Sequence, residues 1–282
     1  PVCCPRMRFD PLIETSMSGA CEADGQWFVL RGRELLLGAD GEIPVGPCPV
    51  GSRSLQVLGE LDGRPCYAVD LPETAAAPPG GVFVDPKTLL DRLPQRAGGM
   101  LARALEIIEW DRSHRFCGAC GAPTAQRSAA IMRACSNDAC RREHFPRVSP
   151  VVIVSVERGE EILLGRSPHF PPGFYSVLAG FVDAGESAEE AVHREIFEET
   201  ALRVRDLRYF ASQPWPFPHS LMLGYQAAYA GGEIVCAPGE IEDAAFFHVD
   251  RLPTSFPLKA TLSHWLIRDF CRRHGRVWPP AG

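Results

Sequence analysis

The segment from Gly180 to Thr200, GFVDAGESAEEAVHREIFEET, constrains the fold most, because it crowds seven acidic residues into twenty-one positions. Ser187 followed three residues later by Glu190 has the form of a capping box, which predicts a helix that starts near Ser187. Gly185 allows a sharp turn into that helix. At about 100° per residue, four apolar side chains gather on one face and predict packing against a core: Ala188, Ala191, Val192 and Ile196.

Three carboxylates interrupt this apolar face. Glu195 and Glu199 fall inside it, and Glu198 lies on its flank. Carboxylates turned toward a protein interior lose hydration, which costs several kcal/mol per ion unless something compensates. Their i, i+3 and i+4 spacing lets their oxygens converge on a hard divalent cation. An ordinary charged amphipathic helix, with Glu190 and Arg194 as a surface ion pair, stays open as the alternative.

The wider pattern resembles the Nudix box, G-x5-E-x7-R-E-U-x-E-E-x-G-U, in which U is apolar. The matching residues are Gly180, Glu186 and the stretch REIFEETAL that begins at Arg194. Ala201 stands where the family has glycine. If this position needs a positive φ, alanine costs about 1 kcal/mol there and the exit geometry of the helix is in question.

The resemblance implies a loop-helix-loop that holds Mg²⁺ or Mn²⁺ through Glu195, Glu198 and Glu199. In the family, Arg194 orients these carboxylates and Glu186 belongs to the same network. Nudix enzymes hydrolyse a nucleoside diphosphate linked to another group. A divalent cation suits this chemistry, because it can neutralise the diphosphate oxygens and deliver an activated water.

Four of the eleven cysteines have the spacing of metal ligands. Cys117 and Cys120 form C-x2-C, and Cys135 and Cys140 form C-x4-C fourteen residues later. Two such turns can supply four thiolates to Zn²⁺, with Gly118 and Gly121 easing the first turn. A closed four-cysteine site leaves no open coordination position, so we expect a structural zinc ribbon rather than a catalytic zinc. Buried free thiols or a redox pair are the alternatives.

The remaining cysteines, at positions 3, 4, 21, 48, 66, 236 and 271, show no ligand spacing, and we expect reduced thiols. A chain of 282 residues suggests about two domains. We find neither a signal segment nor an apolar run of about 18 residues, so we expect a cytoplasmic protein without a membrane span.

The chain divides by pattern into three regions. Residues 1–112 carry short apolar runs between Gly and Pro and predict a small strand-rich domain, which ends in a helix over GGMLARALEIIEWDRSH. Residues 113–146 hold the zinc ribbon. Residues 147–282 alternate expected strands, including EIVCAP, with the acidic helix and a closing helix in LKATLSHWLIRDFCRRHG. This order fits the α/β/α sandwich with a mixed sheet that the Nudix resemblance implies.

The stretch SQPWPFPHS, from Ser212 to Ser220, reads as a rigid loop, because its three prolines fix φ. Trp215 and Phe217 project aromatic faces that suit stacking on flat heterocycles, although such rings can also simply fill a core. SQPWPFP-x-S is similar to the signature of the NADH pyrophosphatase subfamily of Nudix enzymes. That subfamily also carries an N-terminal domain and a four-cysteine ribbon.

The subfamily resemblance implies further site residues. Glu240 stands where a carboxylate completes the metal site or helps to activate the water, with Glu242 as the fallback. Phe181 matches the ring that packs on nicotinamide, and Ser220 is a polar contact to substrate. The implied reaction converts NADH or NAD⁺ and water to (reduced) nicotinamide mononucleotide and AMP, in a homodimer. The sequence ranks neither NADH, NAD⁺ and NADPH nor Mg²⁺ and Mn²⁺.

Two other functions stay open. The same chemistry removes an NAD cap from the 5′ end of RNA, and residues 111–147 hold seven arginines against three acidic residues, a patch that suits an RNA backbone or a free diphosphate. The net charge of −6 disfavours broad nucleic-acid binding. The second possibility is a non-catalytic binding module, against which the intact Arg194, Glu195, Glu198 and Glu199 argue.

Overall fold

The computed structural model describes residues 24–50, 55–126, 131–255 and 257–278. Its contacts group the chain into two units. The first comprises Pro1–Arg147 together with Pro216–His219, and the second comprises Val148–Trp215 and Ser220–Gly282. The expected ribbon therefore falls inside the first unit, and the domain boundaries near residues 112 and 146 stay predictions.

A six-stranded mixed sheet forms the centre of the first unit, as the apolar runs predict. Its strands are β1 (Gly25–Arg31), β2 (Glu34–Leu37), β3 (Val45–Gly46), β4 (Leu55–Leu61), β5 (Arg64–Leu71) and β6 (Val82–Val84). The order is β4-β5-β1-β2-β6, with β3 also paired to β1. Strand β1 runs parallel to β5 and antiparallel to β2, which makes the sheet mixed.

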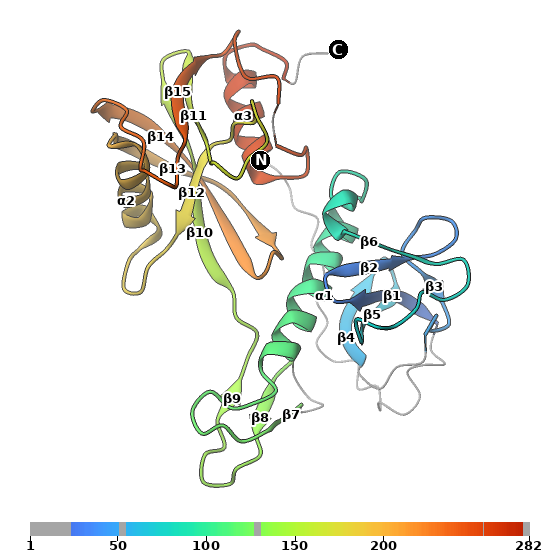
Figure 1. Ribbon diagram of the computed structural model, residues 1–282. Helices are drawn as coiled ribbons and strands as arrows, with labels where there is room; N and C mark the ends of the chain where they lie inside the picture. Colours follow the sequence, from blue (N-terminus) through green and yellow to red (C-terminus); the bar gives the residue numbers. More distant parts are fainter. Residues whose placement is uncertain (1–23, 51–54, 127–130, 256, 279–282) are drawn as a thin grey trace. The chain divides into compact units, whose positions relative to one another are not determined.

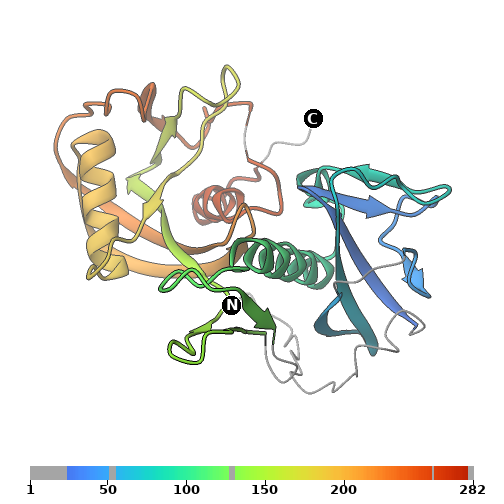
Figure 2. The same ribbon diagram turned by 60° about the horizontal axis from the view of Figure 1, so that its bottom comes forward.

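Both faces of this sheet are buried. Phe28 and Leu30 of β1 pack with the helix α1 (Gln95–Ser113), which lies against the strands in Figure 2 and follows the short 3-10 turn η2 (Pro86–Leu89). The alternate residue Trp27 stacks on Tyr67 in a second cluster, with ring centroids 4.6 Å apart. Alternation along β1 thus fills two separate cores.

The ribbon is a small three-stranded sheet, ordered β7 (Thr124–Gln126), β8 (Arg133–Cys135) and β9 (Glu143–His144). The first cysteine turn closes through a hydrogen bond from the Gly121 N–H to the Cys117 carbonyl oxygen at 2.8 Å. Gly121 has a φ of 73°, so glycine suits this corner, whereas Gly118 has no positive φ. In the second turn, the N–H of Arg141, at φ 50°, donates to the Asn137 carbonyl oxygen.

A second six-stranded mixed sheet forms the other unit. Its strands are β10 (Ser149–Arg158), β11 (Glu161–Arg166), β12 (Leu178–Phe181), β13 (Arg203–Trp215), β14 (Ser220–Gly231) and β15 (Asp243–His248). The order is β13-β14-β10-β11-β15, and β12 also pairs with β10. Strands β10 and β14 are parallel, whereas the other pairs are antiparallel.

Two helices cover opposite faces of this sheet (Figure 1). Helix α2 (Ala188–Thr200) packs with Val152 and Val154, whereas α3 (Leu262–Arg273) packs with Ile153 between them. The predicted α/β/α sandwich is thereby confirmed. No helix within the described ranges is long and apolar enough to cross a membrane.

Two local expectations are wrong. Residues 233–238, EIVCAP, form no strand, because their backbone runs along the end of α2: the Val235 N–H donates to the Thr200 carbonyl oxygen and the Ala237 N–H to that of Glu199, both at 3.0 Å. The stretch 212–220 is mostly a β-hairpin, and only residues 216–219 form its turn. Pro214 is compatible with β13 because that strand lies at the sheet edge.

Candidate functional site

Helix α2 starts where the sequence predicts. The Glu190 N–H donates to Ser187 Oγ at 3.2 Å, and the Ser187 N–H donates to Glu190 Oε2 at 2.8 Å, which completes the capping box. Gly185 precedes the cap at φ 89°. The predicted apolar face is buried, with Ala191, Val192 and Ile196 fully inaccessible and Ala188 partly buried.

The helix ends at Ala201 in the left-handed region, at φ 59° and ψ 12°. Its N–H donates to the Phe197 carbonyl oxygen at 2.7 Å, which satisfies one of the terminal carbonyls of the helix. The positive φ that the family's glycine indicates is therefore present in this chain, and alanine occupies it at a cost of about 1 kcal/mol.

Gly180 in β12 leaves room for the carboxyl group of Glu195. A Cβ atom at position 180 would collide with all three atoms of that carboxyl group. The absence of a side chain lets α2 bring this acid directly against the strand. The first glycine of the motif is thus explained by close approach, since Gly180 has no positive φ.

Arg194 connects the acidic side chains of this region. Its guanidinium donates to Glu186 through Nε and Nη2 at 2.8 Å, and through Nη1 to Glu195 at 2.9 Å and Glu198 at 3.0 Å. A fifth hydrogen bond goes to the Phe181 carbonyl oxygen at 2.8 Å. Arg194 thus contacts Glu186, Glu195 and Glu198, and its role in orienting metal ligands stays a prediction.

Glu199 has the least stabilised negative charge of these acids. Its Oε2 atom is buried and has no hydrogen-bond partner among the described residues. Burial, followed by the charges of Glu195, Glu240 and Glu198, raises the pKa of Glu199 from its ordinary 4.5 to about 8. A buried carboxylate oxygen without a donor is rare and costly, so a divalent cation is the group that it fits.

The two carboxylates beyond α2 are distinguished by their neighbours. Glu240 acts on the pKa of Glu199 through its charge, which places it beside the acidic cluster. Glu242 instead forms an ion pair with Arg166, and its N–H donates to the Arg166 carbonyl oxygen at 2.8 Å. The geometry favours Glu240 over the fallback, because Glu242 is already neutralised.

The acids lie in one region but do not form a closed ligand cluster. Within the described ranges, only the four ribbon cysteines have ligand atoms that all lie within 4.8 Å of one another. Arg194 holds Glu195 and Glu198, whereas Glu199 receives no such bond. These acids offer carboxylate oxygens, the hard donors that Mg²⁺ or Mn²⁺ binds. The most buried of these side chains is Glu199, whose Oε2 has no partner among the described residues.

The predicted zinc ligands come together. The sulfurs of Cys117 and Cys140 are 3.8 Å apart, and those of Cys120 and Cys135 are 3.4 Å apart. Four thiolates about 2.3 Å from a tetrahedral zinc are separated by about 3.8 Å, so these cysteines fit the ion. The Asn137 N–H donates to the Cys135 sulfur at 3.4 Å, a bond that stabilises a thiolate.

His144 is a residue that the sequence reasoning missed. Hydrogen bonds lower the pKa of Cys117 to about 6, first from the Ala119 backbone and with a smaller contribution from His144. A thiolate is the form that binds zinc, and side chains beside the ligands tune such sites. A histidine four residues after the last ribbon cysteine was the available signal.

The predicted substrate-contacting residues have varied surroundings. Phe181 is 57% exposed and free to stack on a ligand, and Trp215 at the end of β13 is partly buried. Ser220 is only 5% exposed. Phe217 packs against the core of the first unit, with the Lys87 ammonium 5.0 Å from its ring centroid. Their roles in binding substrate stay predictions.

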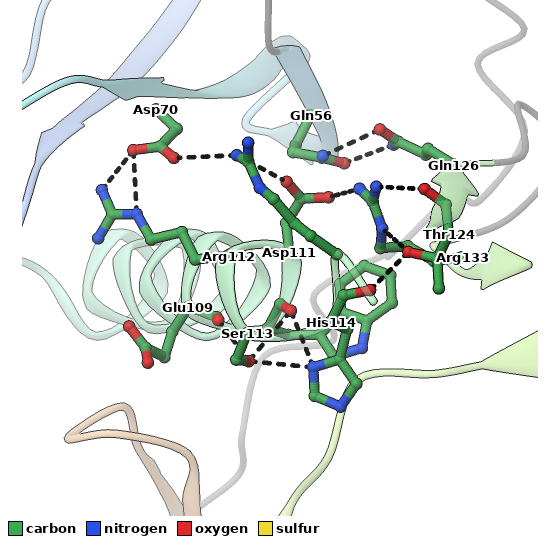
Figure 3. A network of polar contacts seen from close by, with 12 residues as sticks. Gln56, Asp70, Glu109, Asp111, Arg112, Ser113, His114, Thr124, Gln126 and Arg133 are labelled. Atoms are coloured by element: carbon green, nitrogen blue, oxygen red, sulfur yellow. Dashed lines mark hydrogen bonds and ion pairs between the residues drawn. The ribbon is translucent and has the colours of Figure 1, made fainter. Parts of the chain in front are cut away.

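The arginine patch is largely neutralised within the first unit (Figure 3). Asp70, which lies outside the window counted in the sequence, accepts from Arg112 and pairs with Arg115. Asp111, almost fully buried, pairs with Arg133 at 2.6 Å. Arg141 pairs with Asp138, and Arg127 lies outside the described residues. Only Arg142 and Arg147 of this patch lack an ion pair among the described residues, so the part of the patch that the structure describes forms no broad basic track.

Three protein-family models match successive regions of this chain. The family model "NUDIX domain" matches residues 146–268, "NADH pyrophosphatase-like rudimentary NUDIX domain" matches 24–110, and "NADH pyrophosphatase zinc ribbon domain" matches 112–145. A crystal structure of a Nudix hydrolase from Nitrosomonas europaea aligns with 58% of this chain and 94% of its own, at 22% identity and a TM-score of 0.48.

Two relatives are named NAD-capped RNA hydrolase NudC. The protein from Chromobacterium violaceum is 42% identical over 263 residues, covering 93% of this chain and 97% of its own. The protein from Stutzerimonas stutzeri is 45% identical over 227 residues, covering 80% and 81%. The chain therefore belongs to the Nudix hydrolase family. Within that family, its three matched regions are those of the zinc-ribbon-containing NADH pyrophosphatase subfamily.

Proposed function

We propose that this protein hydrolyses the diphosphate bond of NADH or NAD⁺, giving (reduced) nicotinamide mononucleotide and AMP. The observation that carries the proposal is the buried Oε2 of Glu199, which has no hydrogen-bond partner within the described ranges and lies close to Glu195, Glu198 and Glu240. A site built only to stabilise the fold would pair this carboxylate with a donor. Three carboxylates and one unsatisfied oxygen instead suit a cation that binds phosphate.

The residues of the site then have distinct roles. When bound by Glu195, Glu198 and Glu199, Mg²⁺ or Mn²⁺ supplies charge neutralisation for the diphosphate and lowers the pKa of an attacking water. Arg194 fixes Glu195 and Glu198 in place. Burial raises the pKa of Glu199 to about 8, so its carboxyl group holds a proton near neutral pH in the metal-free protein and would give up that proton as a metal ligand. Glu240 completes the ligand set or accepts the proton of the water.

The substrate side of the proposal rests on aromatic groups. Phe181 follows Gly180 directly, its carbonyl oxygen accepts from Arg194, and its ring is exposed, which suits a nicotinamide face. Trp215, Phe217 and Ser220 come from the signature hairpin and are proposed as further contacts. We also propose a homodimer located in the cytoplasm, and one structural Zn²⁺ per chain in the ribbon.

The test is hydrolysis of NADH, NAD⁺, NADPH and ADP-ribose with either Mg²⁺ or Mn²⁺, with identification of products. We expect nicotinamide mononucleotide and AMP, and a loss of at least about a hundredfold in rate in Glu199→Gln, because one metal ligand is weakened. Glu242→Gln is the matched control and should keep most activity. Equal rates in Glu199→Gln and the parent protein would refute the assignment of the site.

A second candidate function is removal of an NAD cap from RNA. It is favoured by the name of the relatives that are 42% and 45% identical, NAD-capped RNA hydrolase. The same diphosphate is cut in either case, so the same acids serve both reactions. A 5′-NAD-capped RNA compared with NADH, by kcat/KM under identical conditions, ranks the two substrates.

A non-catalytic binding module is the remote alternative. It predicts no metal-dependent hydrolysis of any of these substrates. Metal-dependent activity that disappears in Glu199→Gln would dismiss it, because a binding surface would not depend on one buried carboxyl group.

A further inference from the structure

The first unit contains a pocket of about 590 Å³ that the proposed hydrolysis does not use. It lies where the end of α1 meets the ribbon, and Pro218 and His219, which belong to the same unit, complete its wall. A pocket of this size accommodates a small organic ligand such as a nucleotide.

Two polar atoms in the pocket wall lack partners. Trp110 is 4% exposed, and its Nε1–H donor has no acceptor among the described residues. The Nε2 atom of His144 is likewise buried without a partner there. A buried donor left unpaired costs free energy, so a ligand oxygen placed at the indole N–H recovers that cost. Trp110 thus points to an acceptor-bearing ligand.

Two positive charges in the same wall are available to an anion. Arg142 and Arg147 line the pocket, and neither forms an ion pair among the described residues. Arg147 acts on a second residue of the pocket wall, His114. Burial lowers the pKa of His114 most, and among charged side chains Arg147 contributes most to the lowering. Arginine forks bind phosphate oxygens in two-point contacts, which makes a phosphate group the ligand oxygen that they favour.

The rest of the wall suits a nucleoside. Phe116 lines the pocket with a ring that is 67% exposed, a face on which a base can stack. Glu106, Glu109 and Glu143 also line it, and carboxylates accept hydrogen bonds from ribose hydroxyls and base amino groups. These acids offset the two arginines, so a small inorganic anion alone is not favoured.

We propose that this pocket binds one nucleoside monophosphate unit, with the phosphate toward Arg142 and Arg147 and the base against Phe116. The unit is either a free nucleotide or a nucleotide of an RNA chain, and only the RNA source rests on the proposed cap removal. Binding here is separate from hydrolysis, because none of these residues belongs to the acidic cluster.

The experiment observes the indole N–H signal of Trp110 in a ¹H–¹⁵N spectrum of the full-length, zinc-loaded Glu199→Gln protein. The chain has five tryptophans, and the signal is assigned by its loss in Trp110→Phe. Titrants are AMP, adenosine, inorganic phosphate and an uncapped hexa-adenylate RNA, without added divalent metal. The Glu199→Gln protein is used so that nucleotide binding in this pocket is tested independently of the proposed hydrolysis.

We expect a downfield shift of the Trp110 indole proton with AMP or with the RNA, and the titrant that acts at lower concentration identifies the source. Arg142→Ala with Arg147→Ala should raise the half-saturation concentration at least about tenfold, since the charge-assisted hydrogen bonds to the phosphate are lost. Arg141→Ala, an exposed ribbon arginine paired with Asp138, is the matched control and should bind as the parent does.

If the double variant folds poorly, titrations of the protein with intact Arg142 and Arg147 test the proposal. Adenosine, which lacks the phosphate, should bind at least about tenfold more weakly than AMP. An indole signal that stays unmoved by millimolar AMP and RNA overturns the proposal. Equal binding of adenosine and AMP also overturns it, because the arginines would then have no role.

Discussion

The carboxyl group of Glu195 occupies the space that a side chain on Gly180 would fill. Gly180→Ala should therefore displace Glu195 from the strand and reduce hydrolysis at least about tenfold, since metal ligands tolerate little misplacement. Gly98→Ala in α1 is the control, because nothing lies within 4 Å of the added methyl group. Parent-like kcat/KM in Gly180→Ala would show that Glu195 need not approach the strand.

Replacing Ala201 by glycine should stabilise the protein by about 1 kcal/mol, because Ala201 sits at a φ of 59°. The measurement is the free energy of unfolding by urea. Ala188→Gly in the first turn of the same helix should destabilise by about 0.5–1 kcal/mol, which separates the conformational effect from a general effect of glycine. A destabilised Ala201→Gly would contradict the expectation.

The metal-free protein should lose stability as the pH rises from about 4.5 to about 8. The folded-state pKa of Glu199 lies above its ordinary value, so folding favours the protonated carboxyl group and that advantage disappears on deprotonation. The loss is on the order of a few kcal/mol. Thermal unfolding in a chelator of Mg²⁺ and Mn²⁺, across this pH range, measures it, and Glu199→Gln should remove most of the dependence.

Cys135→Ser should abolish stoichiometric zinc binding, because three thiolates no longer close the tetrahedron. Elemental analysis should give about one zinc per chain in the parent protein and much less in the variant. Cys236→Ser, which alters a half-buried cysteine outside the ribbon, should keep its zinc. Zinc well below one per chain in the parent protein would refute the ribbon assignment.

Arg133→Ala should destabilise the protein by about 3 kcal/mol, because Asp111 is almost fully buried and loses its closest positive charge. Arg115 remains 3.7 Å away and limits the loss. The exposed pair of Arg141 and Asp138 is the comparison, and its removal should cost about 0–1 kcal/mol. Equal effects of the two substitutions, in denaturant unfolding, would contradict this account of the network.

The parts of the fold that depend on neighbouring residues were predictable from the sequence. The capping box at Ser187, the buried face of α2 and the four cysteines all follow from short spacings. The mixed sandwich followed from the family resemblance rather than from periodicity. The strand expected at 233–238 was wrong because those apolar residues follow the end of α2 instead of the sheet.

Ion pairs between residues far apart in the sequence could not be predicted from the sequence. The sequence counts the arginines between residues 111 and 147 but not that Asp70 neutralises two of them, because Asp70 and Arg112 are 42 positions apart. Likewise, the choice between Glu240 and Glu242 depends on Arg166, 76 positions before Glu242. Charge in a window of sequence therefore overstated the basic surface of the ribbon.

The amide side chains of Gln56 in β4 and Gln126 in the ribbon exchange two hydrogen bonds, at 3.1 and 2.7 Å (Figure 3). Gln56 is 2% exposed, so a change at Gln126 leaves the Gln56 amide buried without its hydrogen-bond partner. The two positions, seventy residues apart, should therefore vary together among related chains, as a matched polar pair or a matched apolar pair. Such covariation would record, in sequence alone, that ribbon and first sheet evolved as one folding unit.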